Sequence, residues 1–140
     1  MTPEQAIREA QEQKLRPVYL LVGDERHLEG NVVQALRAAA TAGGIPGLNE
    51  DQIQAHDSAV DTALSAARTL PMMAKRRFVL VRGLEHWEPR EGSESKALDR
   101  LLEYAQNPAP TTTLVLLGGG LDKRRKLVTS ARNPATKRAR

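Results

Sequence analysis

The chain has 140 residues, of which 40% are hydrophobic and 27% charged, a balance typical of one globular domain and not of a disordered chain. It contains no cysteine, which excludes disulfide bonds and thiolate metal sites. It also lacks a signal-peptide apolar region and any apolar run long enough to span a bilayer. We therefore expect a cytoplasmic protein without a membrane partner.

The net charge of +4 is distributed unevenly along the chain. Residues 121–140 hold eight Lys or Arg residues and one acidic residue, whereas the first 120 residues hold 13 basic and 16 acidic residues. We expect a mildly acidic folded domain over residues 1–132 and a basic, disordered tail over residues 133–140. A nucleic-acid partner inferred from the overall charge alone would be weakly supported.

The first part of the chain predicts two helices on either side of one strand. A helix is expected from Thr2 to about Lys14, because Thr2 can cap it and the following proline suits a first helical position. The continuous apolar run 17–22 predicts a strand buried on both faces. A second helix is expected to begin at Asp24 and to end at the glycine-rich segment 43–47.

The middle of the chain predicts a strand, a helix and a second strand. Residues 51–55 are polar, which favours a strand at the edge of a sheet. Ser58, with Asp61 three residues later, resembles a capping box and predicts the start of a helix with an inward face up to Ala67. The apolar run 78–81 predicts a buried strand.

The last part predicts a polar loop over residues 83–92 and a helix that begins at Ser93 or Ser95 and ends at the Asn-Pro pair 107–108. A buried strand is expected over residues 112–117. Strands that alternate with helices indicate right-handed crossovers and a parallel sheet covered on both faces. The expected fold class is therefore α/β, a small parallel-sheet sandwich with helices on both faces.

The segment 69–77 is the most informative part of the chain. Two adjacent methionines, Met72 and Met73, follow a proline and precede three consecutive cations. Neighbouring residues on a helix point about 100° apart, so two adjacent methionines do not fit one narrow core stripe. Because methionine is flexible and favoured on partner-binding surfaces, the segment is interpreted as an exposed apolar wedge that holds another protein. The alternative is that both side chains fill the end of the core.

No pattern in the sequence indicates an enzyme site. A P-loop needs Lys and Ser or Thr directly after its second glycine, but Asn31 follows Gly30, and Gly23 lies at the wrong spacing. Asp24 and Glu25 would also repel a phosphate group there. The histidines are scattered without zinc-ligand spacing, and no serine lies in a nucleophile elbow. We therefore expect a non-catalytic chain that holds no cofactor and no metal.

A basic cluster near the end of the chain allows two interpretations. It consists of Lys123, Arg124, Arg125 and Lys126. These side chains are possible contacts to DNA phosphate, which would make binding depend on salt concentration. The interpretation that we favour is the solvated face of a terminal helix, with cations favourably placed near its carboxyl end.

The order of these segments resembles the N-terminal domain of the bacterial DNA polymerase III delta subunit. The similarity rests on five segments in the right order and spacing: 17–25, 70–81, 104–108, 113–117 and 121–127. Together they extend over about residues 15–128, nearly the whole chain. Residues 132–140 match no pattern of that family, whose full-length members continue into a second small domain and a helical collar domain.

The resemblance implies an AAA+-like, P-loop NTPase-like fold without a working Walker A motif. It also implies a clamp-loader subunit that binds the sliding clamp, the beta subunit, and helps open it for loading onto primed DNA during replication. The family's clamp-binding residues are an apolar pair on a short helix before the third strand. This pair corresponds to Met72 and Met73, with Leu70 as a supporting contact.

The further partners that the resemblance implies are the other clamp-loader subunits, in a full-length protein, and the family as a whole belongs to a DNA-directed DNA polymerase. Two other functions remain open from the residues alone. One is a DNA-binding module driven by the basic tail, and the other is a nucleotide-handling α/β enzyme.

Overall fold

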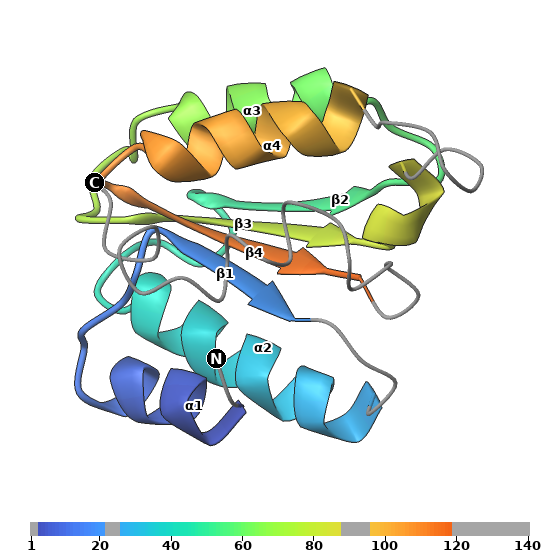
Figure 1. Cartoon of the computed structure of the whole chain (residues 1–140). Helices are drawn as coiled ribbons and strands as arrows, with labels where there is room; N and C mark the ends of the chain where they lie inside the picture. Colours follow the sequence, from blue (N-terminus) through green and yellow to red (C-terminus); the bar gives the residue numbers. More distant parts are fainter. Residues whose placement is uncertain (1–2, 22–25, 88–95, 119–140) are drawn as a thin grey trace.

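A four-stranded parallel sheet forms the centre of the computed structural model, which describes residues 3–21, 26–87 and 96–118. The strands are β1 (Val18–Leu21), β2 (Glu50–Gln54), β3 (Arg77–Arg82) and β4 (Thr112–Leu117). They lie in the order β1-β4-β3-β2, and each neighbouring pair is parallel. The amino ends of all four strands therefore meet at one edge of the sheet, on the left of Figure 1.

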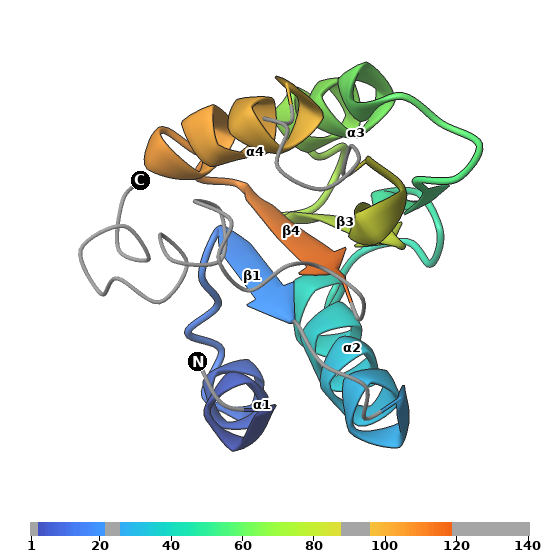
Figure 2. The same ribbon diagram turned by 45° about the vertical axis from the view of Figure 1, so that its right-hand side comes forward.

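Two helices cover each face of the sheet (Figures 1 and 2). Helices α1 (Pro3–Gln11) and α2 (Arg26–Ala40) pack on one face, and α3 (Val60–Arg68) and α4 (Lys96–Gln106) pack on the other. The sheet separates two apolar clusters, one centred on Tyr19, Leu36 and Phe78 and the other on Val79, Leu101 and Leu114. The predicted α/β class, with helices on both faces of a parallel sheet, is confirmed.

The two outer strands differ from the two inner ones in burial. All six side chains of β4 are buried, whereas Val18 and Leu20 of β1 are only partly buried. The prediction that the first strand is buried on both faces is wrong, because β1 lies at the edge of the sheet and pairs with β4 alone. The prediction of an edge strand over residues 51–55 is confirmed by β2.

The start of α3 also differs from the prediction. Ala59, not Ser58, is the N-cap residue, and no side chain bonds to the first turn. The Ser58 hydroxyl instead donates to the neighbouring carboxylate of Asp57 at 3.2 Å, and Asp61 forms an ion pair with Arg100 of α4. A capping box is absent here because both of its side chains have other partners.

The polar loop expected over residues 83–92 begins with a short 3-10 helix, η1 (Leu84–Trp87). The side chain of Leu84 is fully buried, and the Trp87 indole donates a hydrogen bond to the Ser58 carbonyl at 2.9 Å. These contacts order the start of the segment, since an apolar side chain in the core and a long-range hydrogen bond both fix its position.

Several predictions concern residues outside the described ranges. These are the Asp24 cap, the helix start at Ser93 or Ser95, the basic cluster 123–126 and the tail 133–140. Among the described helices, none has both the length and the apolar character needed to cross a membrane.

Candidate protein-binding site

Five large apolar side chains are exposed among the described residues, and all five lie in two loops. Ile45 and Leu48 lie in residues 41–49, between α2 and β2, which we name the glycine loop. Leu70, Met72 and Met73 lie in residues 69–76, between α3 and β3, which we name the methionine loop. We call these five side chains the apolar loop surface.

The methionine side chains do not belong to the core. Met72 is 61% exposed, Met73 is 81% exposed and Leu70 is 72% exposed. The alternative that both methionines fill the end of the core is therefore wrong. Leaving three neighbouring apolar side chains in water forgoes the free energy that their burial would supply, and such patches on monomers often mark binding sites.

The two loops lie side by side at the amino edge of the sheet. Each loop leads directly into a strand, β2 or β3, and these strands are hydrogen-bonded neighbours with Glu50 beside Phe78. Figure 1 shows both loops at the left, where the strands begin. A Cβ atom placed on Gly44 would lie 3.2 Å from the Cβ of Ala74, so the main chain of one loop closely approaches the other.

A buried asparagine joins the two loops. Asn49, the last residue of the glycine loop, is only 3% exposed. Its side-chain amide donates to the Met72 carbonyl at 2.8 Å and accepts from the Met72 N–H at 2.7 Å. Both polar main-chain groups of Met72 are therefore paired, although the two residues lie 23 positions apart in sequence.

The methionine loop is irregular, which corrects the short helix implied by the resemblance. Residues 72–75 form bends without a helical turn, and Met73 has a φ of +56°. Proline at position 71 disfavours a helical conformation for Leu70. A left-handed Met73 then interrupts any helix after it, because only single residues adopt that conformation.

The three cations after the methionines have different environments. Arg77 forms an ion pair with Asp51 of β2. Arg76 is half-buried and donates to the Thr113 hydroxyl at 3.0 Å, and its burial lowers the pKa of the guanidinium, while the nearby Tyr19 opposes that shift. Lys75 is exposed. Two of the three cations thus fasten the end of the methionine loop to the sheet.

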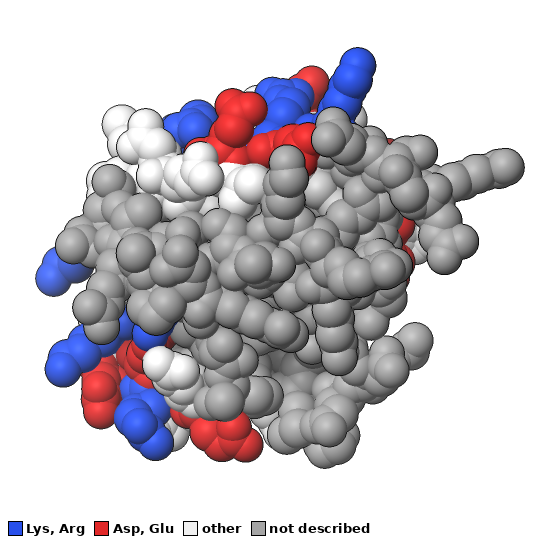
Figure 3. Space-filling model, viewed as in Figure 1, with Lys and Arg blue, Asp and Glu red and all other residues white. Residues whose placement is uncertain are grey.

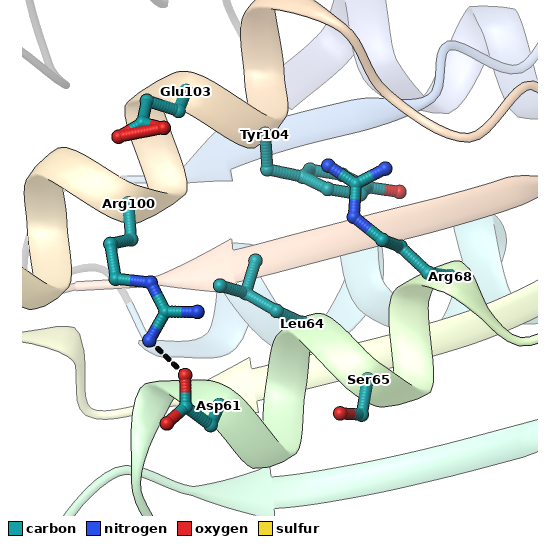
Figure 4. A pocket seen from close by; sticks show the side chains of 7 residues that line it. All are labelled: Asp61, Leu64, Ser65, Arg68, Arg100, Glu103 and Tyr104. Atoms are coloured by element: carbon teal, nitrogen blue, oxygen red, sulfur yellow. Dashed lines mark hydrogen bonds and ion pairs between the residues drawn. The ribbon is translucent and has the colours of Figure 1, made fainter.

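A hollow of about 340 Å³ lies between α3 and α4 (Figure 4). Arg100 is paired with Asp61 at one end, and the Arg68 guanidinium lies 4.8 Å from the centre of the Tyr104 ring at the other. Burial raises the pKa of the Tyr104 hydroxyl, whose oxygen accepts the Ala109 N–H. Asp61, Arg68 and Arg100 are thus engaged with one another or with Tyr104.

Charge is mixed on the described parts of one face of the molecule. In Figure 3, Lys and Arg side chains alternate with Asp and Glu side chains over the described parts of the face shown. The described residues also contain no group of three or more His, Cys, Asp or Glu side chains that could hold a metal ion. Within the described ranges, the apolar loop surface is the strongest candidate for a binding site.

The structure brings the three predicted wedge residues together with residues that sequence reasoning missed. Leu70, Met72 and Met73 share one loop, as expected from their order. Ile45 and Leu48 were not predicted, and neither was the bridge from Asn49. An isoleucine between glycine and proline in an otherwise breaker-rich segment was the one available signal. The possible DNA contacts Lys123, Arg124, Arg125 and Lys126 lie outside the described residues.

Comparison with solved structures supports a shared architecture. The chain is similar to a Bacillus subtilis DNA clamp loader delta protein, with a TM-score of 0.80 and 27% identity, over 99% of this chain and 41% of that one. It is also similar in fold to a DNA polymerase III gamma subunit-related protein from Thermotoga maritima, with a TM-score of 0.62 and 14% identity. That match covers 94% of this chain and 44% of the other.

Sequence comparison gives the same relationship. The chain is 31% identical over 127 residues to DNA polymerase III subunit delta of Bacillus subtilis, which covers 87% of this chain and 36% of that protein. It therefore spans well under half the length of this relative. The family model for the DNA polymerase III delta subunit matches residues 19–138. A match over most of the chain, together with this relative, shows that the chain belongs to the DNA polymerase III delta subunit family.

Proposed function

We propose that this chain binds the sliding clamp through Leu70, Met72 and Met73 and helps open it for loading onto primed DNA during replication. The observation that carries the proposal is the exposure of these three side chains on one irregular loop of a delta-family domain. In this role the chain acts without catalysis of its own, in the cytoplasm, and assembles with other clamp-loader subunits when it is part of a longer protein.

The energy for this role comes from burial of apolar side chains. Covering one exposed methionine or leucine stabilises a complex by roughly 1.5–3 kcal/mol, so three such residues are sufficient for a small binding hot spot. Ile45 and Leu48 lie on the adjoining loop and add apolar area beside them. The partner surface that fits is an apolar pocket, since a charged pocket would lose its water without gaining hydrogen bonds.

Opening of the clamp follows from differential binding. A surface that binds an open or distorted ring more tightly than the closed ring shifts the population toward the open form by that difference in free energy. No bond is broken in this step. The chain therefore needs a rigid apolar surface, and it needs neither a nucleophile nor a nucleotide site.

The test is binding of the purified chain to the sliding clamp of the same organism, measured by surface plasmon resonance. The double variant Met72→Ala/Met73→Ala is expected to lose about 2 kcal/mol, or about 30-fold in Kd, because hot-spot truncations cost that much. A matched control is Thr62→Ala/Asp99→Ala, which truncates two exposed residues of α3 and α4. Circular dichroism of each variant shows that all are folded.

The alternative of a DNA-binding module gives a different result in the same experiment. Binding of DNA through residues 123–126 would fall steeply with salt, because released counterions drive it. If the apolar loop surface binds the clamp, the dissociation rate of that complex is expected to change little between low and physiological salt. Equal clamp binding by the wild type and the methionine variant would overturn the proposal.

A further inference from the structure

We propose that Asn49 is a positioning residue of the clamp-binding surface, whose buried amide fixes the main chain of Met72 and so the directions of the two methionine side chains. The inference rests on the proposed function for the identity of the partner. It adds a residue that makes no contact with the clamp itself and acts through Met72.

The geometry of the bridge is specific for an amide. One side chain both donates to the Met72 carbonyl, at 2.8 Å, and accepts from the Met72 N–H, at 2.7 Å. Both distances are at the short end of the range for N–H···O bonds. Aspartate lacks the donor, leucine lacks both groups, and alanine reaches neither atom. Of these four residues, only asparagine can pair with both the carbonyl and the N–H of Met72.

The amide is held by the most rigid part of the fold. The Asn49 carbonyl accepts the N–H of Phe78, the first fully buried residue of β3, at 2.9 Å. The next residue, Glu50, begins β2 and accepts hydrogen bonds from the Gly47 N–H at 3.0 Å and the Arg37 guanidinium at 2.5 Å. Through Asn49, the main chain of Met72 is therefore held in place by β2, β3 and α2.

The methionine loop has few other restraints. Between described residues, the two bonds to Asn49 are the only hydrogen bonds made by the main chain of residues 70–75. Met73 also adopts a left-handed conformation, with φ at +56°, which is unfavourable for a side chain of this kind. A residue in that state persists only when its surroundings hold it, and the Asn49 amide holds the main chain of the preceding residue.

Fixing the loop before binding improves affinity. A surface that must be ordered on binding loses conformational entropy at that moment, whereas a surface already ordered does not. Loss of two neutral hydrogen bonds is expected to weaken the restraint by about tenfold or more. The side chains of Met72 and Met73 remain present in such a variant, so any loss of binding reflects their positions and not their chemistry.

The first test is hydrogen exchange of the intact chain followed by mass spectrometry. Asn49→Ala is expected to raise exchange in peptides covering residues 69–76 by about tenfold, because the Met72 N–H loses its acceptor. Peptides from β4 stay protected. Asn31→Ala is the matched control, since Asn31 is exposed on α2. Asn49→Leu keeps a similar volume but lacks both the donor and the acceptor, and it replaces the alanine variant if that variant unfolds. Unchanged exchange in residues 69–76 would overturn the proposal.

The second test is clamp binding with a double-mutant cycle. Asn49→Ala is expected to weaken binding about tenfold, and to weaken it less in the Met72→Ala background, because there is then less to position. If the fold-changes in Kd of the two single variants simply multiply in the double variant, Asn49 acts independently of Met72. That result would overturn the inference. If the wild type does not bind, the proposed function fails, and the exchange experiment alone decides whether Asn49 positions the loop.

Discussion

Met73 has a side chain that is mostly exposed and a main chain in an unfavourable conformation. It is 81% exposed and has a φ of +56°. Non-glycine residues in this region cost roughly 1–2 kcal/mol, with asparagine the best tolerated among them. An unfavourable residue at an exposed position is typical of a functional site, since stability alone would select another residue there.

Met73→Asn separates stability from binding. The variant is expected to unfold at the same or a slightly higher urea concentration, because asparagine accepts the left-handed conformation and no buried contact is lost. Clamp binding is expected to fall about tenfold, because one exposed apolar anchor becomes polar. Urea unfolding and surface plasmon resonance measure the two quantities. A variant that loses stability but retains binding would contradict the role given to Met73.

The stability of the fold is expected to depend on pH through the Glu50 carboxyl. Its burial acts to raise the pKa of the carboxyl, but the Gly47 N–H and the Arg37 guanidinium together outweigh that effect, so the pKa lies below its ordinary value. A lowered folded-state pKa adds stability above the unfolded pKa, about 4.3, and this stability is lost as pH falls through the folded value.

Glu50→Gln is expected to be less stable than the wild type at pH 7, because glutamine keeps the shape but not the charge that binds Arg37. The difference shrinks as pH falls below about 4, where the wild-type carboxyl becomes protonated as well. Urea unfolding at pH 7 and at lower pH measures both. A difference that stays constant with pH would show that the ionised carboxyl does not stabilise the fold.

At the scale of elements, the central strands and the methionine loop have opposite roles. Leu114 of β4 is completely buried, whereas Leu70 is 72% exposed. Leu114→Ala is expected to cost about 2–5 kcal/mol in free energy of unfolding, because it leaves a cavity in the core. The same change at Leu70 is expected to stay within about 0.5 kcal/mol. A similar loss for both variants would mean that Leu70 supports the fold.

The regular elements could be predicted because their signals are local. The apolar runs that became β3 and β4 and the apolar stripe of α4 are visible within ten or so residues of sequence. The cap of α3 could not be predicted in this way, since Asp61 is taken by Arg100 of α4. The conformation of the methionine loop depends on Asn49, 23 positions earlier, so local propensity could not supply it.

At the scale of the whole molecule, the sheet brings together what the sequence separates. The exposure of Leu70, Met72 and Met73 could be predicted because they are close in sequence and flanked by breakers and cations. Ile45 and Leu48 could not, because they join the same surface only when β2 pairs with β3. The apolar loop surface is thus a product of strand order, placed at the amino edge of the sheet.

The most direct test of the central claim is site-specific photocross-linking to the sliding clamp. Met73 is replaced by p-benzoyl-phenylalanine in one variant, and Asp99 of α4 in a control variant, both at exposed positions. We expect a cross-link to the clamp from position 73 and none from position 99. A chain that binds the clamp but cross-links from position 99 and not from position 73 would contradict the assignment of the methionine loop as the clamp-binding site.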